Sequence, residues 1–351
     1  MTTPDRKLEH IKICLEEKVE SEYSGFEDVM LIHNALPELN LDEIDTNTRF
    51  LGKELSAPFM IASMTGGHRD TKSINKNIAI AVEELKLGMG VGSQRAAIEK
   101  PELADSFTVV REYAPNALIY ANIGVAQLLE DIEIADRAVE MIDADALAIH
   151  LNFLQEAIQP EGDTNAKGCL KVIEEVCSSV KVPVIIKETG AGISGDVARV
   201  VKKAGASAID VGGRGGTSWS GVEVYRADGI WKDIGRDFWN WGIPTAFCIV
   251  ECCEILPTIA TGGIRSGIDV AKAIALGARV ASSALPFLRP ATISAEEVVK
   301  KLEYFLQGLK VAMFLTSSEK VEDLMGKVFI TGKLKEWLKF RDLRLRGFTH
   351  G

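Results

Sequence analysis

The sequence predicts an α/β fold of the TIM (β/α)8 barrel type. Eight short apolar runs, rich in residues that favour β-strands, recur along the chain and are separated by amphipathic stretches with helical spacing. This alternation is typical of parallel strands that are joined by crossover helices. Eight such units within roughly 250 residues match a closed barrel, whereas a doubly wound open sheet usually contains fewer strands.

The candidate strands are short, and polar or glycine-rich residues follow them. They comprise residues 59–62, 87–91, 118–122, 146–150, 182–187, 208–211, 258–260 and 279–281. Between the first two, Ile74, Ile78 and Val82 have the spacing expected of a crossover helix. We therefore expect one domain over residues 1–351, with the barrel at residues 51–290.

Two segments flank the predicted barrel. Residues 1–50 are polar and acidic and precede the first strand, so we expect an N-terminal extension that packs against the barrel. Residues 291–351 are expected to form C-terminal helices, because Ser294 and Glu297 have the spacing of a capping box. The apolar side of the first of these helices would consist of Val298, Leu302, Phe305, Leu306 and Leu309.

The connection from residue 212 to residue 257 is almost twice as long as the usual repeat. Residues 243–254 should form the crossover helix of this unit. The remainder is predicted to be a loop or lid over the mouth of the barrel, because long loops in compact domains usually have a function. This connection contains four of the five tryptophans of the chain, namely Trp219, Trp231, Trp239 and Trp241.

Composition limits the classes of partner. A net charge of -10 argues against a general binder of nucleic acid or of anionic membranes, because such partners favour a basic surface. The N-terminus has no apolar signal region, and no run approaches the roughly twenty apolar residues that span a bilayer, so we expect a cytoplasmic protein. The six cysteines lack zinc-like spacing and are interpreted as small buried thiols.

Candidate site residues follow the predicted strands, because the chemistry of a TIM barrel lies at the carboxyl ends of its strands. The most informative stretch is the apolar run 146–149, which leads directly into His150, Asn152, Gln155 and Glu156. Unpaired polar groups cost several kcal/mol when they are buried in a core. A functional site at the end of this strand explains the cluster better than a core position does.

The last two strands predict a phosphate site. Residues 261–267 after the seventh strand are rich in glycine, and residues 282–284 after the eighth lead into a helix. Bare backbone N–H groups and a helix start at this place commonly bind phosphate in barrels. The glycines could instead be ordinary turn residues. A phosphorylated cofactor or substrate fits the position better.

Two charged residues at the strand ends have alternative interpretations. Lys187 lies in a strand of valine and isoleucine and would pair with Glu188 or Glu156, or else neutralise a cofactor. A fixed cation beside a flavin favours its reduced, anionic ring. Glu156 is either a Mg²⁺ ligand, because Mg²⁺ is often held by one carboxylate and substrate phosphates, or a surface charge.

Two further patterns are weaker on their own. Arg6, Lys7 and His10 would form a small basic patch if this segment is helical, although a solvated terminus has the same composition. Residues 190–195 match the dinucleotide fingerprint G-x-G-x-x-G, with Asp210 about twenty residues further on. Their place in the fifth of eight units argues against a Rossmann domain, which normally begins with this motif.

Taken together, the motifs resemble type II isopentenyl diphosphate isomerase, and they occur in order over nearly the whole chain. The combination of His-Leu-Asn with Gln-Glu and Gln-Pro-Glu-Gly at residues 150–162 is the most specific. Thr189, Arg214 and Thr261 depart from the expected pattern without affecting the chemistry. The other motifs are Arg6-Lys7 with His10, residues 64–67, 92–95, 121–124, 187–188, 215–219 and 262–265.

The resemblance implies an enzyme that requires FMN and Mg²⁺ and interconverts isopentenyl and dimethylallyl diphosphate. It further implies that NADPH serves only to reduce the flavin and that the chain forms a homo-oligomer, either a tetramer or an octamer. By the same resemblance, Gln155 would face the allylic carbon, with Glu223 as its partner, and Lys187 would complete the catalytic group. Glu156 would hold Mg²⁺.

The resemblance also assigns binding residues. The flavin would be contacted by Ser63, Met64, Thr65, Ser93, Asn122, Lys187 and Thr217, and its phosphate by Gly263, Arg265, Ala284 and Leu285. The substrate would be bound by Arg6, Lys7, His10, Arg95, His150, Asn152 and Gln155.

Two other functions remain open. An FMN-dependent barrel oxidoreductase of the 2-hydroxy acid oxidase kind would share the fold and the phosphate site. Such enzymes use a His and Arg pair after strand six, where this chain has residues 212–219 without a histidine. A flavin- or phosphate-binding protein without turnover would lack the convergent Gln155, Glu156 and Arg95.

Overall fold

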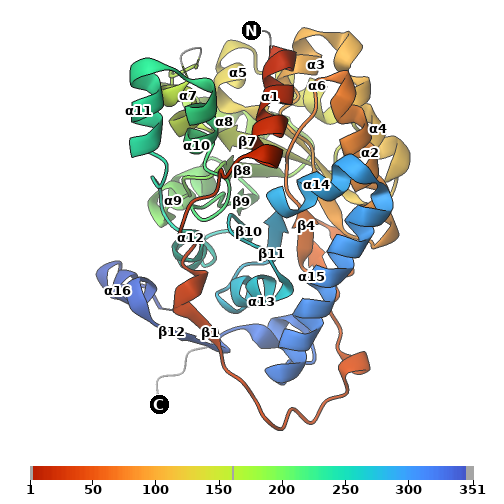
Figure 1. The fold of residues 1–351 in the computed structure, drawn as a ribbon, viewed down its shortest axis with the longest axis vertical. Helices are drawn as coiled ribbons and strands as arrows, with labels where there is room; N and C mark the ends of the chain where they lie inside the picture. Colours follow the sequence, from red (N-terminus) through yellow and green to blue (C-terminus); the bar gives the residue numbers. More distant parts are fainter. Residues whose placement is uncertain (1–2, 160–161, 345–351) are drawn as a thin grey trace.

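The computed structural model describes residues 3–159 and 162–344. At its centre is a closed barrel of eight parallel strands, β4 to β11, in sequence order (Figure 1). The prediction of a TIM barrel is confirmed, and every predicted strand overlaps one barrel strand. The strands are β4 Phe59–Ile61, β5 Gly88–Gly90, β6 Leu118–Gly124, β7 Ala146–Leu151, β8 Val184–Glu188, β9 Ala208–Asp210, β10 Thr258–Thr261 and β11 Val280–Ser283.

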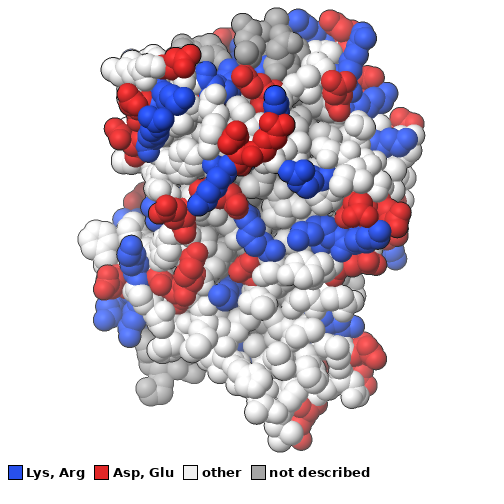
Figure 2. Space-filling view, viewed as in Figure 1, with Lys and Arg blue, Asp and Glu red and all other residues white. Residues whose placement is uncertain are grey.

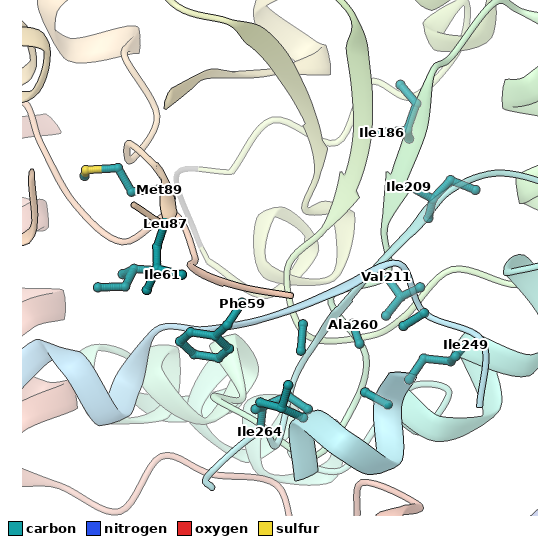
Figure 3. Close-up of a cluster of buried hydrophobic side chains, with 14 of the residues drawn as sticks. Phe59, Ile61, Leu87, Met89, Ile186, Ile209, Val211, Ile249, Ala260 and Ile264 are labelled. Atoms are coloured by element: carbon teal, nitrogen blue, oxygen red, sulfur yellow. The ribbon is translucent and has the colours of Figure 1, made fainter. Parts of the chain in front are cut away.

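The barrel strands separate two apolar layers, because successive side chains of a strand point to opposite faces. Met60 of β4 and Tyr120 of β6 belong to the cluster inside the barrel. Phe59 and Ile61 belong to the larger cluster between the strands and the surrounding helices. Figure 3 shows part of this outer layer, with Ile61 near its register partner Met89 of the neighbouring strand β5.

Crossover helices surround the barrel, and several begin with a serine cap. Ser194, Ser266 and Ser294 each accept the backbone N–H of the third residue that follows, which supports the predicted helix start at Ser294. The long helices on this outer layer are α2 Lys72–Glu84, α4 Asp105–Tyr113, α6 Ile134–Met141, α8 Cys169–Ser179, α9 Gly195–Lys203, α12 Thr245–Cys252, α13 Gly267–Ala275 and α15 Ala295–Leu315.

Shorter elements lie at the ends of the barrel. Four short helices come after barrel strands, namely α3 Arg95–Glu99 after β5, α5 Val125–Glu130 after β6, α7 Phe153–Ile158 after β7 and α14 Leu285–Ile293 after β11. The single-turn 3-10 helices are η1 Phe26–Asp28, η2 Leu41–Glu43, η3 Arg69–Thr71, η4 Pro101–Leu103 and η5 Val321–Leu324.

The two flanking segments meet in a small sheet outside the barrel. The N-terminal segment contains α1 Thr3–Glu16 and β1 Val29–Leu31, and β1 pairs antiparallel with β12 Val328–Ile330 (Figure 1). The C-terminal segment continues with α16 Gly332–Phe340. It was predicted to be helical throughout, but it also contains the strand β12. Its strand was missed because its pairing partner lies about 300 residues away in the sequence, beyond the reach of local patterns.

A hairpin closes the amino end of the barrel. It consists of β2 Thr48–Phe50 and β3 Lys53–Leu55, whose Phe50 and Leu55 join the cluster inside the barrel. The expected boundary between extension and barrel at residue 50 falls inside this hairpin. The interior at this end is thus filled with apolar side chains, which leaves the carboxyl end of the strands for the site.

The predicted lid is helical. Between β9 and α12 the chain forms α10 Trp219–Arg226 and α11 Gly229–Asp237. Helix α10 contacts α1, α7 and α11, and α1 also contacts α14, so that these helices surround the carboxyl end of the barrel (Figure 1). In the part of the chain that the structure describes, no helix is both long enough and apolar enough to cross a membrane.

Candidate active site

The carboxyl ends of the strands open into one cavity of about 230 Å³, to which α1, α10 and α14 also contribute residues. All predicted site residues except Glu223 line it. They are Arg6, Lys7, His10, Ser63, Met64, Thr65, Ser93, Arg95, Asn122, His150, Asn152, Gln155, Glu156, Lys187, Thr217, Gly263, Arg265, Ala284 and Leu285. Arg6, Lys7 and His10 lie at the cavity of their own chain, because α1 folds back across the barrel.

A cradle of backbone groups forms one end of the cavity. Gly262 and Gly263 have positive φ angles of 113° and 76°, which glycine adopts without steric cost. A Cβ atom on Gly263 would lie 2.7 Å from Ser24 and 2.9 Å from the carbonyl of Gly215. Helix α14 begins beside it at Leu285 without a side-chain cap. This combination of glycines and an uncapped helix start suits a phosphate group.

Arg265 stands at the edge of this cradle and is paired with Glu20. Its Nε donates to Glu20 Oε1 at 2.7 Å, and its Nη2 bonds the same oxygen. Glu20 belongs to the N-terminal segment and was not predicted from the sequence. An anion in the cradle would compete with this carboxylate for the guanidinium.

A buried hydroxyl without a partner marks the wall near β4. Thr65 is 3 % exposed and lines the cavity, and its Oγ1 has no hydrogen-bond partner among the described residues. Its backbone is held in place, because the Thr65 carbonyl accepts bonds from Gly92 N–H at 2.9 Å and from Asn75 Nδ2 at 3.2 Å. Buried polar groups nearly always have partners, so this hydroxyl fits a bound ligand.

Lys187 at the end of β8 is paired with Asp210 of β9. Its Nζ lies 2.9 Å from Asp210 Oδ2 and also donates to the backbone carbonyl of Glu188 at 3.1 Å. The predicted pairing with the side chain of Glu188 or Glu156 is therefore wrong. Lys187 lines the cavity, so its cation is available to a ligand as the alternative prediction requires.

His150 is neutral. Burial, followed by the positive charges of Lys7 and Lys187, lowers its pKa to about 3. Its Nδ1 lies 2.8 Å from Asn122 Oδ1, and Asn122 Nδ2 donates to the carbonyl of Val91. Asn122 Oδ1 can only accept, so we assign the proton to Nδ1 and an acceptor role to Nε2. His150 thus adds no positive charge to the cavity at neutral pH.

Arg6, Lys7 and Arg95 form a basic cluster on one wall of the cavity, which Lys187 and Arg265 also line. Burial, and then the like charges of Arg6 and Arg95, lower the pKa of Lys7 to about 8. Arg95 Nε donates to Glu99 Oε1 at 2.6 Å, and Arg6 Nη1 approaches Gln159 Oε1 at 3.5 Å. Like charges gathered in a cavity indicate a site for an anion.

Gln155 is held from behind by Glu223 of α10. Its Nε2 donates to Glu223 Oε1 at 2.9 Å, and His10 Nε2 lies 3.2 Å from the same oxygen. Burial raises the pKa of Glu223, but the bonds from His10 and Gln155 and the charge of Arg226 outweigh it and lower the pKa. Glu223 is not among the residues that line the cavity, so it would act on a ligand through Gln155, the partner that the sequence analysis gives it. Trp219 packs edge-on against His10 with ring centroids 5.1 Å apart.

Glu156 has three hydrogen-bond donors around its carboxylate. Oε1 accepts from Asn152 Nδ2 at 2.8 Å, and Oε2 accepts from Gln159 Nε2 at 2.6 Å and from Asp163 N–H at 2.8 Å. The described residues contain no cluster of three or more His, Cys, Asp or Glu side chains that could hold a metal. A cation here would have Glu156 as its protein ligand and would need oxygen atoms from a substrate.

The fingerprint-like loop at residues 189–192 binds a carboxylate of its own chain. Glu188 Oε2 accepts the successive backbone N–H groups of Thr189, Gly190, Ala191 and Gly192 at 2.6, 2.6, 2.5 and 3.0 Å. Burial raises the pKa of Glu188, although these four bonds oppose it. The loop forms an anion-binding nest, but it is filled from within, which agrees with the rejection of a dinucleotide site.

Several cavity residues were not predicted. Gln127 lies one turn beyond the end of β6, and Ile11 and Cys14 lie on the helix that carries the basic cluster. Barrel sites lie at the carboxyl ends of the strands, and a search that included one helical turn beyond each strand end would have found Gln127. Asp210 was considered only as part of the fingerprint, although it is the last residue of a barrel strand.

Comparisons with known proteins agree with this arrangement. The family described as FMN-dependent dehydrogenase matches residues 145–331. The isopentenyl-diphosphate delta-isomerase of Archaeoglobus fulgidus is 67% identical over 97% of this chain and 100% of that protein. The protein of the same name from Methanococcoides burtonii is 57% identical over 97% of this chain and 96% of its own.

Solved structures share the fold. A flavocytochrome b2 mutant superimposes with a TM-score of 0.68 at 15% identity and covers 98% of this chain and 90% of its own. A mandelate oxidase mutant with a monooxide FMN adduct has a TM-score of 0.61 at 18% identity, with 94% and 92% covered. These low identities establish the fold alone. The full-length relatives establish more: this chain belongs to the isopentenyl-diphosphate delta-isomerase family, in its type II form.

Proposed function

We propose that this chain is an FMN-dependent enzyme that interconverts isopentenyl diphosphate and dimethylallyl diphosphate. The observation that carries the proposal is one cavity that combines a basic wall at Lys7 and Arg95, a glycine cradle at Gly263 and the amide of Gln155. The basic wall suits a diphosphate, in a protein whose net charge of -10 would otherwise repel one.

The chain offers two features that fit FMN. Its phosphate would occupy the cradle formed by Gly262, Gly263 and the start of α14, and the unpartnered hydroxyl of Thr65 would gain a partner. Lys187 would place a fixed cation beside the ring. When bound in its reduced form, FMN supplies a nitrogen that exchanges a proton over the substrate and an electron-rich ring that stabilises a developing tertiary cation.

The remaining residues bind and orient the substrate. Arg6, Lys7 and Arg95 would hold the diphosphate, and Glu156 would hold Mg²⁺ together with the phosphate oxygens. The amide of Gln155 has no useful pKa and is fixed by the ionised Glu223, so it either relays a proton or positions the alkene. Trp219 would exclude water from the developing cation.

Further parts of the proposal concern the cell and the assembly. We propose that NADPH reduces the flavin, that the enzyme is cytoplasmic, and that it binds neither nucleic acid nor membranes. Figure 2 shows basic and acidic side chains interspersed over much of the visible face, with fewer charges toward the lower end. Met30 of β1 and Phe329 of β12 are exposed by 57% and 49% as a cross-strand pair, which supports a homo-oligomer.

An anaerobic assay tests the function. Isopentenyl diphosphate is incubated with the enzyme, FMN and Mg²⁺, with and without NADPH, and dimethylallyl diphosphate is measured. We expect isomerisation only with reduced flavin, its loss when Mg²⁺ is chelated, and a decrease of about 100-fold in kcat for Gln155→Ala. An enzyme that instead oxidises a 2-hydroxy acid and forms no dimethylallyl diphosphate would contradict the proposal in favour of the oxidase.

A further inference from the structure

Lys187 and Asp210 form a buried ion pair at the wall of the cavity. They are direct partners in the register of β8 and β9, and Lys187 Nζ lies 2.9 Å from Asp210 Oδ2. Lys187 lines the cavity, whereas Asp210 does not and is completely buried. The carboxylate therefore contacts the ammonium group from the neighbouring strand without lining the cavity itself.

Each member of the pair has a second anchor in the backbone. Asp210 Oδ1 accepts the N–H of Gly212 at 3.3 Å, and Lys187 Nζ donates to the carbonyl of Glu188 at 3.1 Å. These bonds fix the direction of both side chains. A buried ion pair contributes little net stability compared with apolar residues of similar size. Packing alone therefore gives no reason for an ion pair beside Ile185, Ile186 and Ile209.

Asp210 affects the charge around the Lys187 ammonium group more than the other register partner of Lys187 does. On the other side of Lys187, its register partner is His150, which is neutral at pH 7. The electrostatic effect of Asp210 reaches the barrel interior. There the pKa of Tyr120 is raised, first by burial and second by the negative charge of Asp210. The positive charge that a ligand meets at Lys187 is therefore set by the ammonium and the carboxylate together.

We propose that Asp210 is a positioning residue of this site, which directs the Lys187 ammonium toward the cavity and moderates its charge. The reduced, anionic ring of FMN would then meet a cation that is fixed in place and partly neutralised. This inference rests on the FMN site proposed above. Asp210 acts through Lys187, because it has no contact with the cavity of its own.

The isosteric variant Asp210→Asn tests the inference. It retains an oxygen that can accept from Lys187 Nζ but removes the counter-charge. With two electrons and one proton taken up in both proteins, the midpoint potential of bound FMN should become more positive in the variant. Equivalently, the ratio of the affinity for reduced FMN to the affinity for oxidised FMN should rise by about tenfold. This is the size of effect expected when one charge is removed several ångströms from the ring in a protein interior. An unchanged or more negative potential would overturn the inference.

Two further variants separate this role from a structural one. Asp145 is also a paired aspartate, 2.9 Å from both Lys53 and Arg111, but it precedes β7 at the amino end of the barrel. Asp145→Asn should lower the melting temperature and leave the flavin potential unchanged.

The double variant Lys187→Met with Asp210→Asn removes both charges, so without FMN it should be more stable than Asp210→Asn alone. If the double variant is no more stable than Asp210→Asn, the two charges do not stabilise each other, and the proposed pairing of Asp210 with Lys187 is wrong.

The outcomes also distinguish this inference from the proposed function. If the wild-type protein binds no FMN and forms no dimethylallyl diphosphate, the proposed function is wrong. A wild-type protein that does both, with Asp210→Asn at the wild-type potential, would overturn the role of Asp210 alone. The stability comparison needs no cofactor and tests the pairing in either case.

Discussion

Two glycine-rich loops at the same rim of the barrel differ in what their backbone N–H groups contact. The β8 loop, residues 189–192, wraps four backbone N–H groups around Glu188. In the β10 loop, residues 262–265, the N–H groups of Gly262 and Gly263 have no hydrogen-bond partner among the described residues. Both loops contain glycines with positive φ, so their local chemistry is similar. One nest is closed by the chain itself, and the other remains open for a ligand.

The difference arises from the residue that precedes each loop. Glu188 is the last residue of β8 and its carboxylate reaches the N–H groups that follow it, whereas β10 ends with Thr261. The closed nest gives a rigid wall, since Thr189 and Gly190 line the cavity. The open nest would give the binding site that the proposed function requires. The following experiments test whether the two loops have these separate roles.

The largest effect is expected from emptying the closed nest. Glu188→Ala removes the carboxylate oxygen that four half-buried N–H groups share, and among the described residues only that of Gly192 keeps another acceptor, the carbonyl of Gly212. The variant should lower the free energy of unfolding by about 3 kcal/mol. Denaturant unfolding measures this change, and Glu188→Gln should lose less because its amide oxygen can still accept. The matched control is Glu83→Ala, which removes bonds to the N–H groups of Asn116 and Ala117 at the amino end. If Glu83→Ala impairs FMN binding as much as Glu188→Ala does, the closed nest has no specific role at the site.

A substitution in the open nest should affect binding more than folding. Gly263→Ala would place a Cβ 2.7 Å from Ser24 at a φ of 76°, so the cradle must distort. We expect FMN binding, measured by fluorescence titration, to weaken by about 100-fold, since a phosphate site depends on the position of its N–H groups. Gly52→Ala is the control, because Gly52 also has a positive φ but a Cβ there would meet no atom within 4 Å. Equal losses of FMN binding in both variants would contradict the role of the β10 loop.

The basic wall should show a pH dependence that the closed nest does not. The pKa of Lys7 is lowered to about 8, so its ammonium is present below this pH and is lost as the pH rises through it. One pH unit above that value, kcat/KM for isopentenyl diphosphate should fall by about tenfold. Lys7→Arg keeps its charge over this range and should show no such fall. A fall of the same size in Lys7→Arg would assign the pH dependence to another group.

The smallest effect is expected at the edge of the open nest. Glu20→Gln removes the carboxylate that competes with a phosphate for Arg265, so FMN should bind about 2- to 3-fold more tightly. The effect is small because both side chains of the pair are partly exposed. Glu54→Gln breaks a comparable exposed pair with Arg49 on the hairpin and should leave the affinity unchanged. Weaker FMN binding in Glu20→Gln would mean that Glu20 positions Arg265 instead.

Much of the fold and the set of cavity residues could be predicted from the sequence, because both depend on local patterns. The eight strands are visible as apolar runs, and the rule that barrel sites lie at strand ends selected residues such as Thr65 and Gln155. The strand β12 could not be predicted in this way, since its partner β1 is distant in the sequence. The helices α10 and α11 were likewise predicted only as a loop or lid.

The sequence by itself determined the barrel, the rim on which the site lies and the family, since each is written in short runs of neighbouring residues. Only the tertiary structure decided the partner of each charge. Lys187 pairs with Asp210 rather than with Glu188 or Glu156, because β8 and β9 are neighbours in the barrel. Glu188 instead fills the nest that resembled a dinucleotide motif. Electrostatic pairing depends on distance in space, which a linear sequence does not record.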